Sequence, residues 1–213
     1  MNETLKRGLS GAVYVAIMWL GTSYSELSFH ILFSVILVIC LYEMWKLRKG
    51  KTKILAFIYV LTPLLLVHLY SQKVILFIFI LTWTFDTFAY LFGVRFGKTK
   101  IMPSVSPKKS WEGFAGGFIF TVLASFITTH YFLEVDNSIA LAMSLFLPFT
   151  ATLGDFTESY FKRQAGVKDS GNFIPGHGGM LDRMDAFMIT IPAIMISLFL
   201  ISIIYYSIII KFI

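Results

Sequence analysis

The sequence predicts an all-α polytopic membrane protein with about seven transmembrane helices, and three observations lead to that prediction. Of the 213 residues, 57% are hydrophobic and only 14% are charged, whereas about 25% are charged in an ordinary soluble domain. The run from Ala186 to Ile210 has no charged residue, and roughly 20 apolar residues let a helix cross a bilayer. Polar segments separate the other apolar runs, and none of them indicates a soluble domain, so we expect a single integral-membrane domain over residues 1–213.

The first part of the chain, about residues 1–73, is expected to form scaffold helices. Its apolar runs cover about 9–22, 27–45 and 54–69. The first run is short enough for a signal peptide, but the residues from Gly21 to Tyr24 make a poor small-residue cleavage site, so a retained helix is predicted. The second run ends in Glu43 and a basic cluster that is typical of a cytoplasmic loop.

The catalytic part is expected in residues 74–213, beginning with a helix over about 74–94. Asp86 lies well inside this helix, where an acid costs about 2.5–3.5 kcal/mol on insertion scales. Tyr90, Gly93 and Gly97 follow it at helical spacing and share its face. This pattern fits either the polar wall of a site or a hydrogen bond between helices, and we favour the site.

A basic loop follows, with Pro103 and Pro107 keeping it from being helical. Lys108 and Lys109 stand next to serines, Ser106 among them, and near glycines. Such a loop fits an ordinary positively charged cytoplasmic loop, but paired lysines beside hydroxyls and glycines also form a suitable cradle for a polyphosphate.

Two further helices are predicted over about 113–133 and from 138 to about 163. The first begins with Gly113 and Gly117, a spacing that lets helix backbones approach closely. The second carries a stripe of polar residues along its last two turns, namely Asp155, Glu158, Ser159 and Lys162. A solvated helix end would explain the stripe, but the mixture of acids with a later Lys-Arg pair favours a site.

The distribution of basic residues predicts the orientation. Sixteen of the eighteen lysines and arginines fall in four alternate segments, and only Lys73 and Lys211 lie outside them. The positive-inside rule then places the amino terminus and both glycine-rich basic loops in the cytoplasm and the carboxyl terminus outside. Because the basic residues flank apolar runs, the net charge of +6 indicates anionic lipid headgroups as partners and no nucleic acid.

The segment from Ser159 to Asp185 is a dense polar island between two apolar runs. Asp182 and Asp185 are three apart at the start of the last helix, so their carboxylates share a face. The helix dipole alone would explain either acid at this position. It does not explain both acids together with His177, Gly178 and Gly179, which come just before them. Carboxylates suit Mg²⁺, and nearby lysines and arginines suit a polyphosphate. Motifs for acyl transfer and for zinc hydrolysis are missing from the sequence.

This island, SYFKRQAGVKDSGNFIPGHGGMLDRMD, closely resembles the signature of the phosphatidate cytidylyltransferase (CDP-diacylglycerol synthase) family. The stretches DTFAYLFGVRFGKTK, SPKKSWEG and GDFTES look like the same family. Together they cover most of residues 86–185, whereas the first 80 residues are only generically similar. Family members commonly have more residues and one or two additional spans.

The resemblance implies a transfer of CMP from CTP to phosphatidic acid on the cytoplasmic face of a membrane, the inner membrane if the protein is bacterial. The expected cofactor is Mg²⁺, and membrane lipids are further partners; a homodimer is left open. The expected metal ligands are Asp155, Asp182 and Asp185. The expected catalytic residues are Asp155, Lys162, Arg163, Lys168, Asp169, His177, Asp182 and Asp185, and the expected substrate-binding residues are Asp86, Ser106, Lys108, Lys109, Ser159, Gly178, Gly179 and Arg183.

Two other functions stay open on the sequence. A CTP-dependent enzyme could act on another lipid, either as an ether-lipid phosphate cytidylyltransferase or as a polyprenol kinase. A transporter or channel could use Asp86 to conduct ions or protons, but it would leave the glycine-rich HGGMLDRMD run unexplained.

Overall fold

The computed structural model describes residues 3–51 and 53–212. Some side chains of the terminal helices, those of Lys6, Arg7 and residues 200–212 among them, lie outside the described set. The chain is built of helices with one short hairpin, which confirms the all-α class. In chain order the elements are α1 (Glu3–Ser23), α2 (Glu26–Leu47), α3 (Ile54–Leu66), the 3-10 turn η1 (Val67–Leu69), α4 (Gln72–Phe96), β1 (Lys100–Met102), β2 (Ser106–Ser110), α5 (Trp111–Tyr131), α6 (Asn137–Gln164) and α7 (Leu181–Phe212).

Four of these helices, α2, α4, α5 and α6, are long and apolar enough to cross a membrane. The stretches Gly8–Ser23 and Ile54–Leu69 are apolar but shorter, and much of α7 lacks described side chains. Each α-helix coincides with an apolar run of the sequence, and α6 continues to Gln164 through the polar stripe, as predicted. The chain is therefore a membrane protein by the length and composition of its helices.

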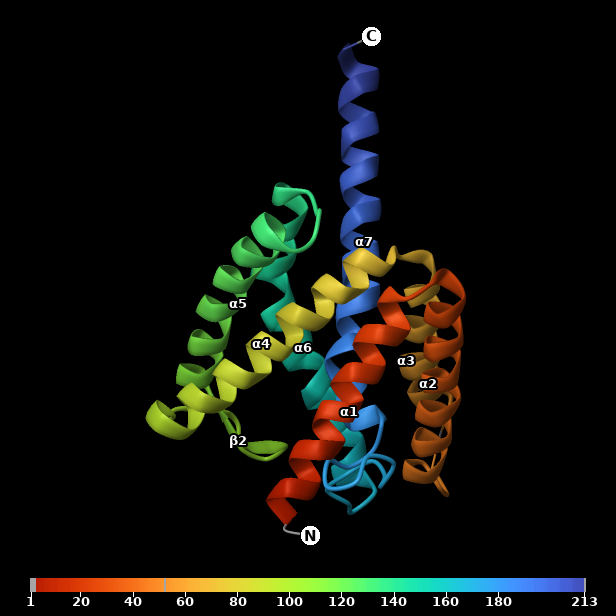
Figure 1. The fold of residues 1–213 in the computed structure, drawn as a ribbon, viewed down its shortest axis with the longest axis vertical. Coiled ribbons are helices and arrows are strands. Elements are labelled where there is room, and N and C mark those ends of the chain that lie inside the picture. Colours follow the sequence, from red (N-terminus) through yellow and green to blue (C-terminus); the bar gives the residue numbers. More distant parts are fainter. Residues whose placement is uncertain (1–2, 52, 213) are drawn as a thin grey trace.

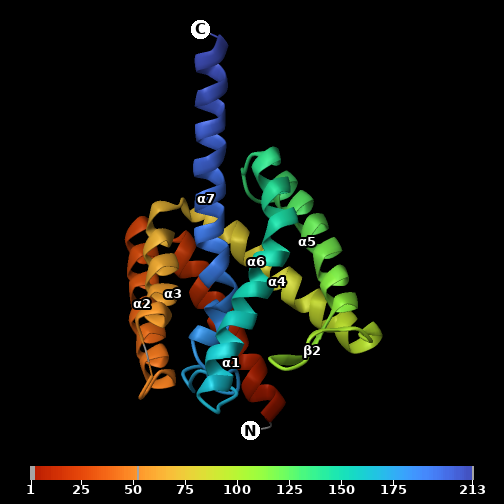
Figure 2. The same ribbon diagram turned by 180° about the vertical axis from the view of Figure 1, so that it is seen from behind.

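The helices form two groups around α7, and the views from opposite sides agree on this arrangement (Figures 1 and 2). The antiparallel pair α2 and α3 lies on one side, α5 lies on the other, and α4 crosses obliquely between them. Aromatic side chains join α4 to its neighbours, since the ring centroid of Phe79 on α4 is 4.6 Å from that of Phe187 on α7 and 6.3 Å from that of Phe33 on α2. All three rings are buried, so they fix α4 between α2 and α7.

Glycines bring α5 close to α4, as their spacing predicts. A Cβ atom added at Gly113 would lie 2.6 Å from the backbone oxygen of Ala89, and one at Gly117 would lie 2.7 Å from the ring of Phe85. No side chain fits in so little space, so these two positions let the backbones touch. The contact holds the polar face of α4 against the start of α5.

The basic loop is a two-stranded antiparallel hairpin of β1 and β2. The sequence analysis predicted a non-helical loop and missed these strands, which are too short to show an alternating pattern. Glu112 ties the hairpin to α5, because its carboxylate accepts hydrogen bonds from the amides of Lys98 (3.1 Å) and Thr99 (3.0 Å). The hairpin thus holds its lysines beside the end of α6 and the start of α7.

Candidate functional site

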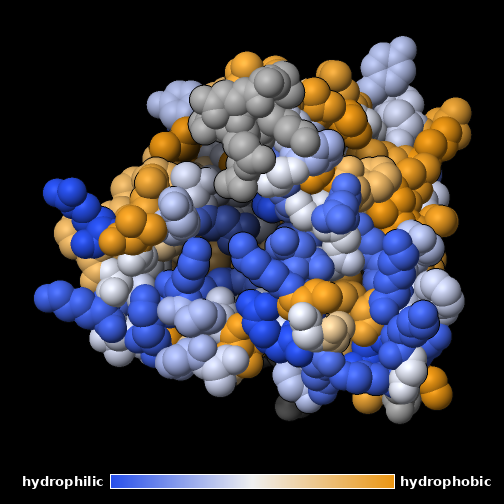
Figure 3. All heavy atoms as spheres, turned by 90° about the horizontal axis from the view of Figure 1, so that it is seen from below, coloured by the Kyte–Doolittle hydropathy of each residue, from blue (hydrophilic) through white to orange (hydrophobic). Residues whose placement is uncertain are grey.

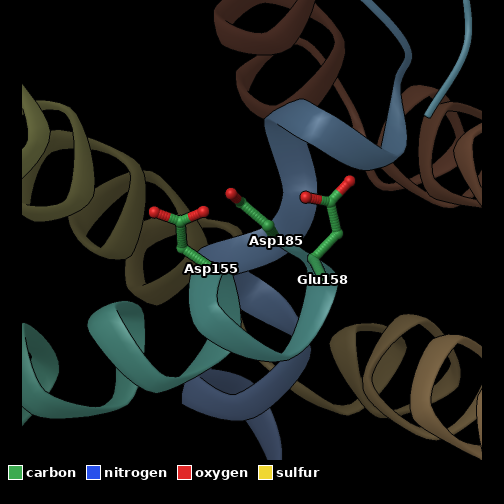
Figure 4. Close-up of side chains that lie close together, drawn as sticks. All are labelled: Asp155, Glu158 and Asp185. Atoms are coloured by element: carbon green, nitrogen blue, oxygen red, sulfur yellow. The ribbon is translucent and has the colours of Figure 1, made fainter. Parts of the chain in front are cut away.

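Three carboxylates meet where α6 passes the start of α7 (Figure 4). Asp155 and Glu158 project from α6 and Asp185 from α7, and one oxygen of each lies within 4.8 Å of the others. Gly154 makes the approach possible, because a Cβ there would collide with the backbone oxygen of Asp185. We refer to Asp155, Glu158 and Asp185 as the acid cluster.

Two lysines neutralise part of this negative charge. Lys109 of β2 forms an ion pair with Asp155, and Lys162 forms ion pairs with Glu158 and, at 2.7 Å, with Asp182. Lys162 and its two partners are largely buried, where Coulomb interactions are stronger than in water. The Oε1 atom of Glu158 is buried and has no hydrogen-bond partner among the described residues.

Asp182 has different surroundings, although it lies one turn from Asp185. It accepts hydrogen bonds from the amide of Gly179 (2.7 Å) and from the amide of Ser170 (3.0 Å), besides the bond from Lys162. Burial opposes ionisation of Asp182, but these bonds outweigh burial and hold the pKa of this carboxyl, which lies ahead of the apolar run of α7, below its usual value. Both of its oxygens are occupied by the protein.

Residues 165–180, here called the signature loop, join α6 to α7. Gly166, Gly176 and Gly178 have φ angles of 72°, 79° and 88°, a backbone conformation that residues other than glycine rarely adopt. His177 is held at both ends: its backbone oxygen accepts a hydrogen bond of 2.6 Å from Arg183, and its Nδ1 lies 2.9 Å from the hydroxyl of Ser10 on α1.

Two cavities open beside these residues. The larger, about 700 Å³, is lined by Asp86 and Tyr90 of α4, by Lys108 and Lys109 of β2, and by carboxylates from α6 and α7. The smaller, about 650 Å³, is lined by the signature loop, with Lys168 and His177 in its wall. Arg183 lines both cavities. Hydrophilic side chains gather around a hollow on this end of the molecule, and hydrophobic ones border it (Figure 3).

The structure brings most of the predicted site residues to these two cavities. The larger contains Asp86, Ser106, Lys108, Lys109, Asp155, Asp182, Arg183 and Asp185, and the smaller contains Lys168, Asp169, His177, Gly178 and Arg183. Four predicted residues lie beside them. Ser159 donates a hydrogen bond to Asp155 (3.2 Å), exposed Arg163 donates one to the Val167 carbonyl (2.9 Å), and Gly179 packs under Ser170. Lys162 lies between Glu158 and Asp182.

The sequence analysis grouped Asp182 with the metal ligands, whereas the structure groups Glu158 with Asp155 and Asp185. Glu158 was noted only as part of the polar stripe on α6. Its spacing of three from Asp155 was the available signal, but which acid turns toward a common point depends on helix packing. Glu43 was noted only as the end of the second apolar run, beside a basic cluster, and was not assigned to the site.

The acid cluster fits a divalent metal ion. Mg²⁺ prefers carboxylate oxygens and usually binds through one or two protein acids together with substrate phosphates. Three carboxylates packed this closely repel one another, and the unpartnered buried oxygen of Glu158 needs a donor or a cation. Asp155, Glu158 and Asp185 are the residues that would hold the ion.

Comparison with known proteins identifies similar sequences over the part of the chain that forms this site. The sequence model of the Cytidylyltransferase family matches residues 54–201. A phosphatidate cytidylyltransferase of Haemophilus influenzae is 46% identical over 123 residues, which are 55% of this chain and 43% of the relative. Those of Thermotoga maritima and Staphylococcus aureus (strain COL) are each 47% identical, over 120 and 126 residues, or 52% and 58% of this chain and 43% and 48% of the relatives. The chain thus spans about half the length of the curated relatives that it matches.

Proposed function

Because the chain belongs to the cytidylyltransferase family, we propose that it transfers CMP from CTP to phosphatidic acid, giving CDP-diacylglycerol and pyrophosphate. The observation that supports this most directly is the acid cluster, placed between the lysines of the hairpin and the signature loop. It combines ligands for a metal ion with fixed positive charges for phosphates. The names of the relatives support phosphatidic acid as the lipid substrate.

In the proposed reaction, an oxygen of the lipid phosphate attacks the α-phosphorus of CTP. A new P–O bond forms, the bond to the bridging oxygen between the α- and β-phosphates breaks, and pyrophosphate leaves with its electron pair. The lipid phosphate is already largely ionised near neutral pH, so no residue is needed as a base. The protein has to align the two phosphates and neutralise their charge, which are the main contributions to catalysis of phosphoryl transfer.

The residues around the larger cavity have separate tasks in this proposal. Mg²⁺ held by Asp155, Glu158 and Asp185 would supply positive charge to the reacting phosphates. Lys109 and Lys108 bind phosphate oxygens from the hairpin side, and Arg183 does so from α7, where it borders both cavities. A guanidinium can bind two phosphate oxygens at once.

Lys162 and Asp182 do not contact the substrates in this proposal but position the residues that do. Lys162 balances the buried charge of Glu158, and Asp182 holds Lys162 and the amides of the signature loop. This assignment moves Asp182 from the metal ligands to the residues that position the site. Asp86 forms the wall of the larger cavity on α4.

We further propose that all seven helices span the membrane, with the amino terminus in the cytoplasm. The polar end seen in Figure 3 then faces the cytoplasm, where CTP is present, and phosphatidic acid enters from the adjacent leaflet. The distribution of lysine and arginine supports this orientation. A reporter that is active only in the cytoplasm, fused to the amino terminus, would test this orientation. Reporter activity would support it. A homodimer remains a prediction.

The direct test of the function uses purified protein in detergent with Mg²⁺, phosphatidic acid and CTP labelled at the α-phosphate. We expect labelled lipid that requires both substrates and disappears with EDTA. A labelled product with release of pyrophosphate identifies a cytidylyltransferase, whereas lipid phosphate with CDP would indicate a kinase. Ion flux without CTP would instead support a transporter.

A further inference from the structure

Glu43 lies near the end of α2, far in sequence from the site, yet its carboxylate reaches the start of α7. The residue is 4% exposed. Its Oε1 accepts a hydrogen bond from the amide of Met180 (3.1 Å), and its Oε2 accepts bonds from the amide of Leu181 (2.8 Å) and the hydroxyl of Ser170 (3.1 Å). Three donors from the signature loop and α7 therefore converge on one side chain of α2.

The signature loop is shaped to admit this carboxylate. A Cβ atom added at Gly171 would lie 2.5 Å from Oε1 of Glu43, and one at Gly179 would meet both Oε2 and the Ser170 hydroxyl. The two glycines thus leave the space that the carboxylate fills. A carboxylate buried this deeply is costly unless its oxygens are hydrogen-bonded, so the fit between Glu43 and the loop is mutual.

The contacts of Glu43 lead directly to the site. The first amides of a helix have no partner within the helix, and Glu43 binds those at the start of α7. Leu181 is followed at once by Asp182, and Asp185 lies one turn further on. Ser170 links the two sides, because its hydroxyl is 3.1 Å from Glu43 and 3.0 Å from Asp182.

We infer that Glu43 is a positioning residue for the proposed cytidylyl transfer. It fixes the start of α7 and the signature loop from outside the region that matches the family, and so sets where Asp182 and Asp185 point. The inference rests on the proposed function for its effect on turnover, but its effect on the loop can be measured without any activity.

The test compares Glu43→Gln with the matched control Glu26→Gln, which alters an exposed glutamate at the other end of the same helix. Glutamine keeps the size of the side chain but replaces one carboxylate oxygen with an NH₂ group. That group cannot accept the hydrogen bond that the oxygen accepts in the wild-type protein. We expect Glu43→Gln to lower kcat by about 10- to 100-fold, because small displacements of reacting groups are costly. It should also raise the Mg²⁺ concentration that gives half-maximal rate, since Asp185 shifts. Glu26→Gln should leave both values unchanged.

A second measurement follows amide hydrogen exchange of residues 168–183, read by mass spectrometry on purified protein without substrates. Exchange should be faster in Glu43→Gln than in the wild-type protein or in Glu26→Gln, because at least one of the two amides that Glu43 binds loses its acceptor. If the wild-type protein transfers no cytidylyl group, the proposed function fails, and the exchange measurement still decides whether Glu43 holds the loop.

A milder variant covers the case in which Glu43→Gln does not fold. Ser170→Ala removes one donor to Glu43 and leaves both amides in place. It should shift exchange, kcat and Mg²⁺ requirement in the same directions by smaller factors. The inference would be overturned if a folded Glu43→Gln variant showed wild-type exchange and a kcat within about twofold of the wild-type value. If Glu43→Gln does not fold, the same result in Ser170→Ala would overturn it.

Discussion

Asp182 and Asp185 lie one turn apart on α7, and the protein treats their charges in opposite ways. Asp182 receives hydrogen bonds from Lys162 and from the amides of Ser170 and Gly179. Asp185 faces two more acids, Asp155 and Glu158, within 4.8 Å. Its one described hydrogen bond comes from the adjacent amide of Ala186 (2.8 Å). The first carboxylate is satisfied by the protein itself, whereas the second adds to a cluster of negative charge that Lys109 and Lys162 neutralise only in part.

This difference separates stability from activity along a single helix. A satisfied buried carboxylate stabilises the fold, and its loss leaves its partners unpaired. A carboxylate in a like-charged cluster costs stability until a cation binds. The comparison therefore predicts that conservative substitutions at the two positions have opposite consequences.

The largest effect is expected at the acid cluster. Asp185→Asn should lower turnover by about 1000-fold or more, because the site loses a proposed metal ligand and the charge that goes with it. In EDTA its thermal stability should equal or exceed that of the wild-type protein, since one repulsive charge is gone.

Adding Mg²⁺ should raise the thermal midpoint of the wild-type protein and leave that of Asp185→Asn nearly unchanged, because a ligand stabilises only the state that binds it. Turnover and melting curves measured with and without Mg²⁺ check both statements. A folded Asp185→Asn protein with wild-type turnover would remove Asp185 from the metal ligands.

The next effect concerns Asp182. Asp182→Asn should destabilise the protein by about 3 kcal/mol, because it breaks a buried ion pair and leaves Lys162 with Glu158 alone. Its melting midpoint should fall equally with and without Mg²⁺. If Mg²⁺ no longer raised the melting midpoint of Asp182→Asn, as expected for Asp185→Asn, Asp182 would be a metal ligand, as the sequence analysis predicted.

A smaller effect is expected at the hairpin. Lys109→Ala should raise the KM for CTP by about tenfold, because one cation beside Asp155 and the larger cavity is lost. Lys98→Ala is the matched control, since Lys98 is exposed and does not line that cavity. Steady-state kinetics at saturating phosphatidic acid measures both, and equal KM values for the two variants would contradict the assignment of Lys109 to CTP.

Much of this arrangement could be predicted from the sequence. The helices follow the apolar runs, four of which are long enough to cross a bilayer, and serines or aspartates such as Ser110 and Asp136 cap the starts of some of them. Asp86 was recognised because an acid inside an apolar helix is costly. The grouping of Asp182 and Asp185 followed from helical spacing, which fixes a face but not the partners that each side chain meets.

The remaining features depend on contacts between distant segments. Asp86 lies inside its apolar run, whereas Glu43 lies at the end of one, where the basic cluster after it was enough to explain an acid as part of a loop. The contacts of Glu43 with Met180 and Leu181 span 137 and 138 residues, and no local pattern encodes them. Glu158 joined the acid cluster through the packing of α6 on α7 at Gly154.

The smallest effect is expected at Ser10, which tests whether α1 also supports the signature loop. Its hydroxyl donates a hydrogen bond to the Pro175 carbonyl (2.7 Å) and lies 2.9 Å from Nδ1 of His177. Ser10→Ala should weaken the attachment of the signature loop to α1 by about 1 kcal/mol, a typical net value for a hydrogen bond. If the loop must hold this position for catalysis, kcat/KM should fall by about fivefold. Because the smaller cavity changes and the acid cluster does not, the Mg²⁺ requirement should stay at its wild-type value. A raised Mg²⁺ requirement in Ser10→Ala would mean that α1 and Glu43 act on the same element, and that the loop and α7 move as one body.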